Sequence, residues 1–205
     1  EMPDCDPPNF QATELNTYLL STPFKVQTNW HIISGASSSG KTTLINLLKA
    51  KGFKTVPEPA RQYLQQGVAA GHSIAEQQRD LRSLNRRIMA YTLKIELELP
   101  VEERLFCDRG FPDCLSYCRL VGLDPNEFLP ECFHRHYASV FILDRLPFHH
   151  DGVRYEDDAL ADFLHQWTIK DYLALGYEVV KVPVMPPEAR LSYIFEKLVE
   201  QGYRI

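Results

Sequence analysis

The segment GASSSGKT at residues 35–42 has the residue types and the spacing that bind phosphate. It contains two glycines with four residues between them, followed by a lysine and a hydroxyl residue. Glycine allows successive backbone N–H groups to turn inward around an anion, and a helix N-terminus adds further unpaired N–H groups. The segment therefore predicts a phosphate-binding loop for a nucleoside triphosphate.

The side chains of this loop suggest how the nucleotide is held. Lys41 is expected to reach the β- and γ-phosphates, and the Thr42 hydroxyl to ligate the Mg²⁺ that the nucleotide carries. The sequence after residues 140–143 lacks the Asn-Lys-x-Asp stretch that reads guanine, which favours ATP and leaves GTP as the alternative. The expected nucleotide contacts are Gly35, Ser37, Ser38, Ser39, Gly40, Lys41, Thr42 and Thr43.

Short apolar strands alternate with helices along the chain and would position this loop. The pattern predicts an α/β fold of three layers, in which helices cover both faces of a five-stranded parallel sheet. The expected strands are 30–34, 53–56, 104–107, 140–143 and 177–182. The expected helices begin at 41 and 61 and span 72–99, 113–121, 125–137, 156–175 and 187–200. Residues 1–29 contain four prolines and are expected to form an irregular arm before a domain at 30–205.

Three further charged residues follow expected strands and should lie near the loop. In a parallel sheet the ligand site lies beyond the carboxyl ends of the strands. Glu58 could orient or deprotonate an acceptor hydroxyl, or could simply stabilise a helix start. Asp108 could hold Mg²⁺ through water and Arg109 could bind an acceptor anion, or the two could form a structural ion pair. The expected catalytic residues are Lys41, Glu58, Asp108, Arg109 and Arg154, and the expected metal ligands are Thr42 and Asp108.

The polar segment 145–157 has the composition of a lid over the site. Arg154 within it could stabilise charge on the transferred phosphoryl group, and Arg145 is a weaker candidate for the same role. The alternative is that these arginines only keep a surface loop soluble.

Composition restricts the class of protein further. The chain has 205 residues, a net charge of -5 and five cysteines without a close pair. A protein that binds nucleic acid in general needs a basic surface, so we expect none here. We find no apolar run long enough to span a membrane and expect a cytoplasmic protein with reduced cysteines.

Four stretches together resemble a family of small P-loop domains. GASSSGKTTL, VPEPARQYL, FCDRGFPD and the segment from VFILD to DGVRYED are similar to AAA-type ATPase and kinase domains. This family includes the ribosylnicotinamide kinase domain of NadR and the NTPase domain of the TRPL translocation defect protein. The resemblance covers about residues 30 to 200. It implies a kinase-like lid and a strand order 2-3-1-4-5. The Asp108-Arg109 pair is similar to the Asp-Arg pair of thymidylate and deoxynucleoside kinases, and Glu58 lies where deoxynucleoside kinases carry a catalytic carboxylate.

These observations support two functions of different classes. The first is an ATP- and Mg²⁺-dependent kinase of a small metabolite such as a nucleoside. The second is a nucleotide-gated switch, in which ATP or GTP orders the lid for a protein or lipid partner. The acceptor and the oligomeric state do not follow from the sequence.

Overall fold

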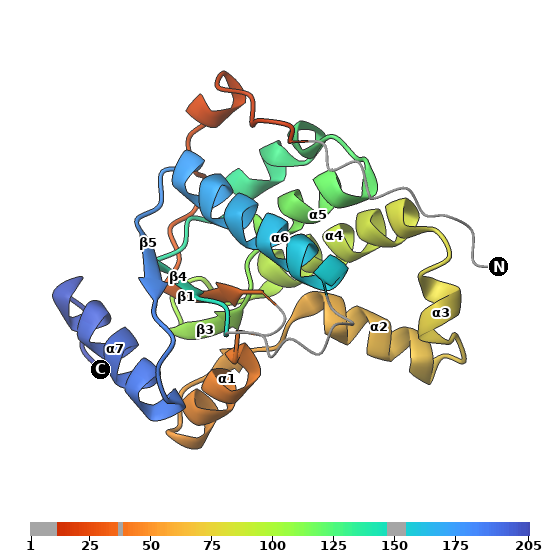
Figure 1. Ribbon diagram of the computed structural model, residues 1–205. Coiled ribbons are helices and arrows are strands. Elements are labelled where there is room, and N and C mark those ends of the chain that lie inside the picture. The colour runs from red at the N-terminus through yellow and green to blue at the C-terminus, as the bar shows by residue number, and fades with distance from the viewer. Residues whose placement is uncertain (1–11, 37–38, 147–154) are drawn as a thin grey trace.

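A five-stranded parallel sheet forms the centre of the protein (Figure 1). A computed structural model describes residues 12–36, 39–146 and 155–205, of which 155–157 by backbone alone. The strand order is β2-β3-β1-β4-β5, which confirms the predicted order and the three-layer architecture. The strands are β1 (Trp30–Gly35), β2 (Thr55–Val56), β3 (Leu105–Asp108), β4 (Ser139–Leu143) and β5 (Val179–Val182).

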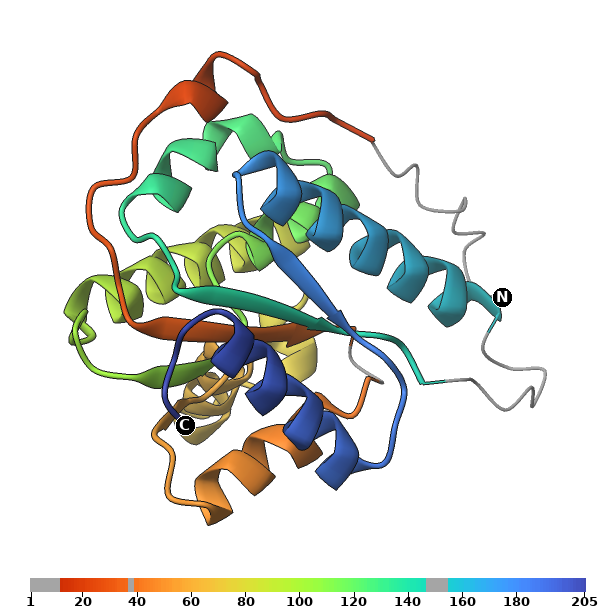
Figure 2. The same cartoon turned by 90° about the vertical axis from the view of Figure 1, so that its left-hand side faces the viewer.

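Helices cover both faces of this sheet, and Figure 2 shows the two layers on either side of the strands. The face that carries α1 (Lys41–Ala50) and α7 (Pro187–Glu200) holds one apolar cluster, and a larger cluster fills the opposite face. In the described part of the chain, no helix has the length and apolar character required to cross a bilayer. The other helices are α2 (Pro59–Ala69), α3 (Ile74–Gln77), α4 (Leu81–Glu98), α5 (Asp113–Val121) and α6 (Tyr155–Ala174).

Strand register brings the chemically active segments to one edge of the sheet. β1 lies between β3 and β4, and Ile33 is paired with Asp108 on one side and Phe141 on the other. The three strands are buried along their whole length, as their apolar sequences predict. Because all three are parallel, the loop after Gly35 and the Asp108-Arg109 step lie at the same edge.

Two of the predicted helices are wrong in detail. The span 72–99 is divided into α3 and α4, because Ser73 and Asp80 each accept a hydrogen bond from a backbone N–H and so begin a helix. The span 125–137 contains two 3-10 turns, Pro125–Glu127 and Leu129–Phe133. Proline supplies no backbone N–H for a longer helix there.

The segment 12–29 follows the larger apolar face of the sheet. Leu15 is buried in that cluster, and Gln27 forms a parallel bridge with His136. The carbonyl of Thr13 accepts a hydrogen bond from Arg119, whose guanidinium is fully buried and bidentate to Asp171. This segment therefore contributes to the core of the domain.

A buried histidine at the opposite end of β1 should make the stability depend on pH. His31 is fully buried, and its Nδ1 lies 2.9 Å from the Ser139 hydroxyl oxygen. Burial, with Arg104 nearby, lowers the pKa of His31 from 6.5 to about 4. The folded protein therefore binds fewer protons than the unfolded chain between these values, and stability falls as the pH falls from 6.5 to 4.

Comparison of the wild type with His31→Gln isolates this effect. Other titrating groups act equally in both proteins, so the difference between the two free energies of unfolding reports on His31. We expect the wild type to lose about 2 to 3 kcal/mol relative to the variant between pH 6.5 and 4. Urea denaturation at several pH values measures it, and parallel curves for the two proteins would contradict the assignment.

Candidate functional site: the phosphate loop and its carboxylates

The glycines of the loop occupy positions that a side chain would obstruct. Gly35 has φ 147°, and a Cβ atom there would lie 2.8 Å from Ser39 Oγ and 3.1 Å from the Leu143 carbonyl. Gly40 has φ 81° and directly precedes α1. Both positions therefore require glycine, as the phosphate-binding pattern predicts. Ser37 and Ser38 lie outside the described residues.

The end of the loop is fixed from outside by a buried arginine. Arg190 of α7 donates hydrogen bonds to the carbonyls of Ser39, Asp144 (2.8 Å) and Pro183 (2.9 Å). Ser39 Oγ is itself buried and has no hydrogen-bond partner among the described residues. A buried hydroxyl costs free energy when it is unpaired, so this oxygen fits a loop that is completed by a polar ligand.

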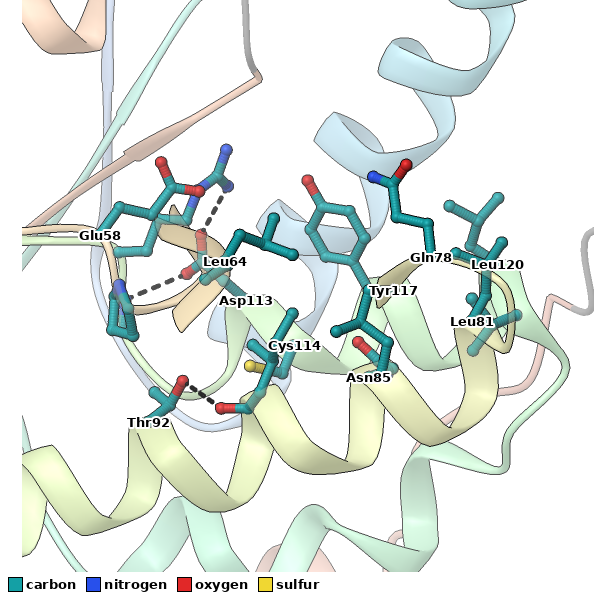
Figure 3. Close-up of a pocket in the computed structure, with 17 residues that line it drawn as sticks. Glu58, Leu64, Gln78, Leu81, Asn85, Thr92, Asp113, Cys114, Tyr117 and Leu120 are labelled. Atoms are coloured by element: carbon teal, nitrogen blue, oxygen red, sulfur yellow. Dashed lines mark hydrogen bonds and ion pairs between the residues drawn. The ribbon is translucent and has the colours of Figure 1, made fainter. Parts of the chain in front are cut away.

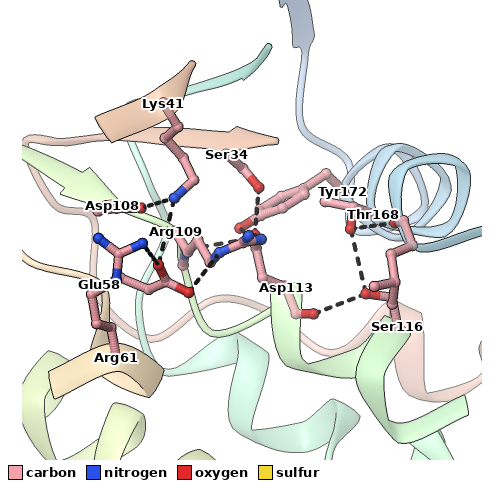
Figure 4. A network of polar contacts seen from close by, with 12 residues as sticks. Ser34, Lys41, Glu58, Arg61, Asp108, Arg109, Asp113, Ser116, Thr168 and Tyr172 are labelled. Atoms are coloured by element: carbon pink, nitrogen blue, oxygen red, sulfur yellow. Dashed lines mark hydrogen bonds and ion pairs between the residues drawn. The ribbon is translucent and has the colours of Figure 1, made fainter. Parts of the chain in front are cut away.

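Lys41 lies between two carboxylates at the edge of the sheet (Figure 4). Its side chain is 5% exposed, and its Nζ is 2.5 Å from Asp108 Oδ1 and 3.7 Å from Glu58 Oε2. Burial raises the pKa of Asp108, and the charge of Lys41 opposes that rise without cancelling it. Thr42 and Thr43 follow on the first turn of α1 and are exposed.

The Glu58 side chain faces the lysine and two arginines. Glu58 occupies the N-cap position of α2, but its carboxylate makes no capping hydrogen bond. It accepts from Arg109 Nε at 3.2 Å and lies 3.8 Å from Arg61 Nη2. Burial raises the pKa of Glu58, but the charges of Arg109, Lys41 and Arg61 outweigh it, so that the net pKa is lowered. Glu58 is therefore ionised at neutral pH.

Arg109 bridges two carboxylates through its guanidinium. Its Nε contacts Glu58, and its Nη1 lies 3.1 Å from Asp113 Oδ2. Its backbone has φ 71°, a left-handed conformation that residues other than glycine rarely adopt. The N–H of Arg109 donates to the Ile33 carbonyl at 3.0 Å and so fixes this step to the end of β1. Arg109 and Asp108 thus have different partners.

Asp113, which was not among the predicted site residues, is the centre of the network. Its carboxylate is buried and accepts hydrogen bonds from the Ser34 hydroxyl, Arg109 and the Tyr172 hydroxyl (2.5 Å). Asp113 lies only four residues after Arg109, and this short separation in the sequence is a signal for their contact. Ser34 and Tyr172 carry no such signal, because they are distant in the sequence.

Replacement of Asp113 should destabilise the protein strongly. In Asp113→Asn an NH₂ group replaces one carboxylate oxygen and cannot accept a hydrogen bond, which leaves buried donors unpaired. Loss of one partner of a buried ion pair costs about 3 to 5 kcal/mol. Asp162→Asn is the matched control. The Asp162 side chain is 61% exposed, and its ion pair with Arg145 is long, at 3.7 Å. We expect this variant to change the free energy of unfolding by less than about 1 kcal/mol. Equal urea midpoints for both variants would contradict this prediction.

Of the two arginines expected in the lid, only Arg145 is among the described residues. Arg154 lies outside the described residues. Arg145 is 15% exposed and contacts Asp158 and Asp162 on α6. Its partners in the described part of the chain are therefore carboxylates of the following helix.

A cavity of about 280 Å³ opens beside Glu58 (Figure 3). It lies among α2, α4 and α5, and Glu58, Arg109 and Asp113 border one end. The described residues contain no group of three His, Cys, Asp or Glu side chains arranged to hold a metal ion. The remaining lining residues are Pro59, Ala60, Leu64, Gln78, Leu81, Leu84, Asn85, Ile88, Thr92, Gly110, Cys114, Tyr117, Leu120 and Val121.

The sheet order, the glycine loop and the lysine at the start of α1 define a P-loop domain with kinase-like architecture. Residues 30–190 match the model of an AAA domain family, and the chain belongs to this family. The resemblance seen in the sequence is thereby confirmed. No curated protein matches the chain.

Solved structures with this fold include NadR protein and two kinases, all at low sequence identity. NadR protein in complex with NAD and AMP-PNP has 16% identity and TM-score 0.62 over 87% of this chain and 51% of NadR. Deoxyadenosine kinase from M. mycoides with dCMP and dCDP has 17% identity and TM-score 0.55 over 83% and 98%. Thymidylate kinase from Candida albicans has 11% identity and TM-score 0.54 over 84% and 92%. The chain thus spans about half of the NadR chain.

Proposed function

We propose that the protein is an ATP- and Mg²⁺-dependent kinase that phosphorylates a hydroxyl group of a small metabolite such as a nucleoside. One observation carries this proposal: the ionised Glu58 carboxylate lies between Lys41 of the phosphate loop and the cavity of about 280 Å³. A carboxylate between a phosphate site and a cavity is placed to act on an acceptor that occupies the cavity.

The donor half of the site consists of the loop and its surroundings. Backbone N–H groups after Gly35 and at the start of α1 would bind the phosphates, and Lys41 would bind the β- and γ-phosphate oxygens. The exposed Thr42 hydroxyl would hold Mg²⁺, with Asp108 acting through water. When bound, the metal neutralises negative charge on the phosphates. Nucleotide complexes of NadR and of deoxyadenosine kinase, which have the same fold, support this proposal.

The acceptor half consists of Glu58 and the cavity. An acceptor hydroxyl oxygen forms a bond to the γ-phosphorus, and the bond from that phosphorus to the β,γ-bridging oxygen breaks to give ADP. The hydroxyl proton passes to the Glu58 carboxylate, whose lowered pKa keeps it ionised at neutral pH. Arg109 holds this carboxylate in place from the side of β3. Arg154 is proposed to close over the phosphates.

Acceptor-dependent ADP release tests the proposal directly. The protein is incubated with ATP and Mg²⁺ alone and then with a broad panel of nucleosides and small hydroxyl compounds. We expect at least one compound to raise ADP release well above the rate without acceptor, with formation of the phosphate ester detected by mass spectrometry. Tight ATP binding with no acceptor-dependent release across the panel would overturn the proposal and favour the nucleotide-gated switch.

A further inference from the structure

The cavity beside Glu58 has little free charge with which to bind an ionised acceptor. Its charged lining residues among the described part of the chain are Glu58, Asp113 and Arg109. These lie at one end, and Arg109 already contacts both carboxylates. Lys41 and Arg61 also lie near Glu58 but do not line the cavity, so the described lining offers an acceptor that carries a phosphate or carboxylate no cation besides Arg109.

The arginines of α4 do not supply the missing positive charge. Arg82 donates to the Val121 carbonyl at 2.9 Å, and Arg86 donates to Glu127 at 2.8 Å. Arg87 donates to the Tyr63 hydroxyl at 3.1 Å. None of these three is among the described residues that line the cavity.

The polar side chains along α4 in the cavity wall are engaged within the protein. The Thr92 hydroxyl donates to the Ile88 carbonyl at 2.8 Å, and the Asn85 amide lies 3.6 Å from Cys118 Sγ. Gln78 and Tyr117 are the other polar side chains that line the cavity. A site that reads a nucleobase usually has several donors and acceptors that converge on its edge. The wall beyond the charged end is instead mainly apolar, as Figure 3 shows in part, with Leu64, Leu81, Leu84, Ile88, Leu120 and Val121.

From these contacts we propose that the cavity binds an uncharged compound with an apolar alkyl or aryl body and a single hydroxyl group. The hydroxyl lies at Glu58, and the body extends along α4 and α5 toward Leu81. The proposal deepens the kinase function above and rests on it, because this compound would be the phosphoryl acceptor. It narrows the acceptor from metabolites such as nucleosides to an apolar alcohol.

Leu81 marks the outer end of this apolar wall and offers a matched pair of variants. It lines the cavity and is 53% exposed at the first residue of α4. Leu97 lies on the same helix, is 44% exposed and is not among the lining residues. Both side chains are exposed enough that replacement by glutamine should leave the fold intact.

A homologous series of linear primary alcohols from butanol to nonanol tests the proposal. Calorimetry with the wild-type chain and a non-hydrolysable ATP analogue measures binding, and ADP release with ATP measures turnover. Each additional methylene that contacts the apolar wall should raise the affinity about four-fold, until the alcohol is long enough to reach Leu81. Thymidine, adenosine and their monophosphates are the comparison ligands and should bind more weakly than the longer alcohols.

The two variants then show where the alkyl part of the bound alcohol lies. Leu81→Gln should lower the affinity for the longest alcohols about five-fold and leave the affinity for butanol unchanged, because only a long alcohol reaches that residue. Leu97→Gln should match the wild type throughout. An effect of equal size in both variants would overturn the placement.

The possible outcomes test the class of ligand and the kinase activity separately. An affinity that rises with the length of the alcohol, without ADP release, supports the apolar ligand and counts against the kinase function. Turnover of nucleosides, with no rise in affinity along the alcohol series, overturns this inference and leaves the kinase function standing. No binding by any alcohol in the series also overturns it.

Discussion

Lys41→Met should reduce phosphoryl transfer about 100- to 1,000-fold, the usual loss when one group that stabilises transition-state charge is removed. Lys41 is the buried cation at the start of α1, and its Nζ is 2.5 Å from Asp108. Methionine keeps the length of the side chain but supplies no charge to the transferred phosphoryl group. Single-turnover measurement of ADP formation at saturating ATP and acceptor checks this result.

The same variant should also lose stability, with a particular dependence on pH. Asp108 would lose its counter-charge, and an unpaired buried charge costs about 3 to 5 kcal/mol. Burial already raises the pKa of Asp108, and without Lys41 that pKa would rise further. The loss should therefore shrink as the pH falls and the Asp108 carboxyl becomes protonated.

The double variant Lys41→Met with Asp108→Asn is the control for this argument. It removes both charges, so stability should recover while phosphoryl transfer stays low. Urea denaturation and ADP formation measured on the same preparations separate the two effects. Recovery of transfer in the double variant would contradict a role for Lys41 at the phosphates.

The parts of the site that the sequence predicts are those built from neighbouring residues. Gly35, Gly40 and Lys41 belong to one short pattern whose glycines are required by backbone geometry. The strands have short apolar sequences, which predict their number, whereas their order followed from the family resemblance. Glu58 follows β2 and Asp108 ends β3, which predicts the edge of the sheet at which they lie but not their partners.

The contacts that remained unpredicted join residues far apart in the chain. Ser34 pairs with Asp113 and Arg190 pairs with Ser39, across 79 and 151 residues. No periodicity connects such residues, since each pair depends on how separate elements pack. The left-handed backbone of Arg109 is also set by its surroundings, because arginine by itself disfavours it.

This long-range network gives Arg109 two partners that the sequence did not predict. The sequence places Arg109 after a strand, where it could bind an acceptor phosphate or carboxylate. The structure pairs its guanidinium with Glu58 and Asp113 instead. Arg109 therefore contacts Glu58 from the side of β3 and helps to lower its pKa, while the binding of an acceptor anion by Arg109 stays a prediction.

Glu58→Gln should reduce phosphoryl transfer about 100- to 10,000-fold, the usual contribution of a positioned base. Glutamine has the size of glutamate, and its side-chain oxygen can still accept a hydrogen bond from Arg109. It cannot take up the acceptor proton at neutral pH. Nucleotide affinity should stay unchanged, because the loss falls on the transfer step. Pre-steady-state ADP formation and fluorescent-ATP titration on one preparation separate these quantities.

The pH dependence of the transfer rate and a control variant at a second glutamate complete the test. The pKa of Glu58 is below its ordinary value of 4.5, so the wild type should keep its rate as the pH falls from 8 toward 5. Glu188→Gln is the matched control, since Glu188 also lies at a helix start but its side chain is 69% exposed. It should transfer phosphate at the wild-type rate. If Glu58→Gln does so too, then Glu58 is not the base, and its ion pairs with Lys41 and Arg109 are structural.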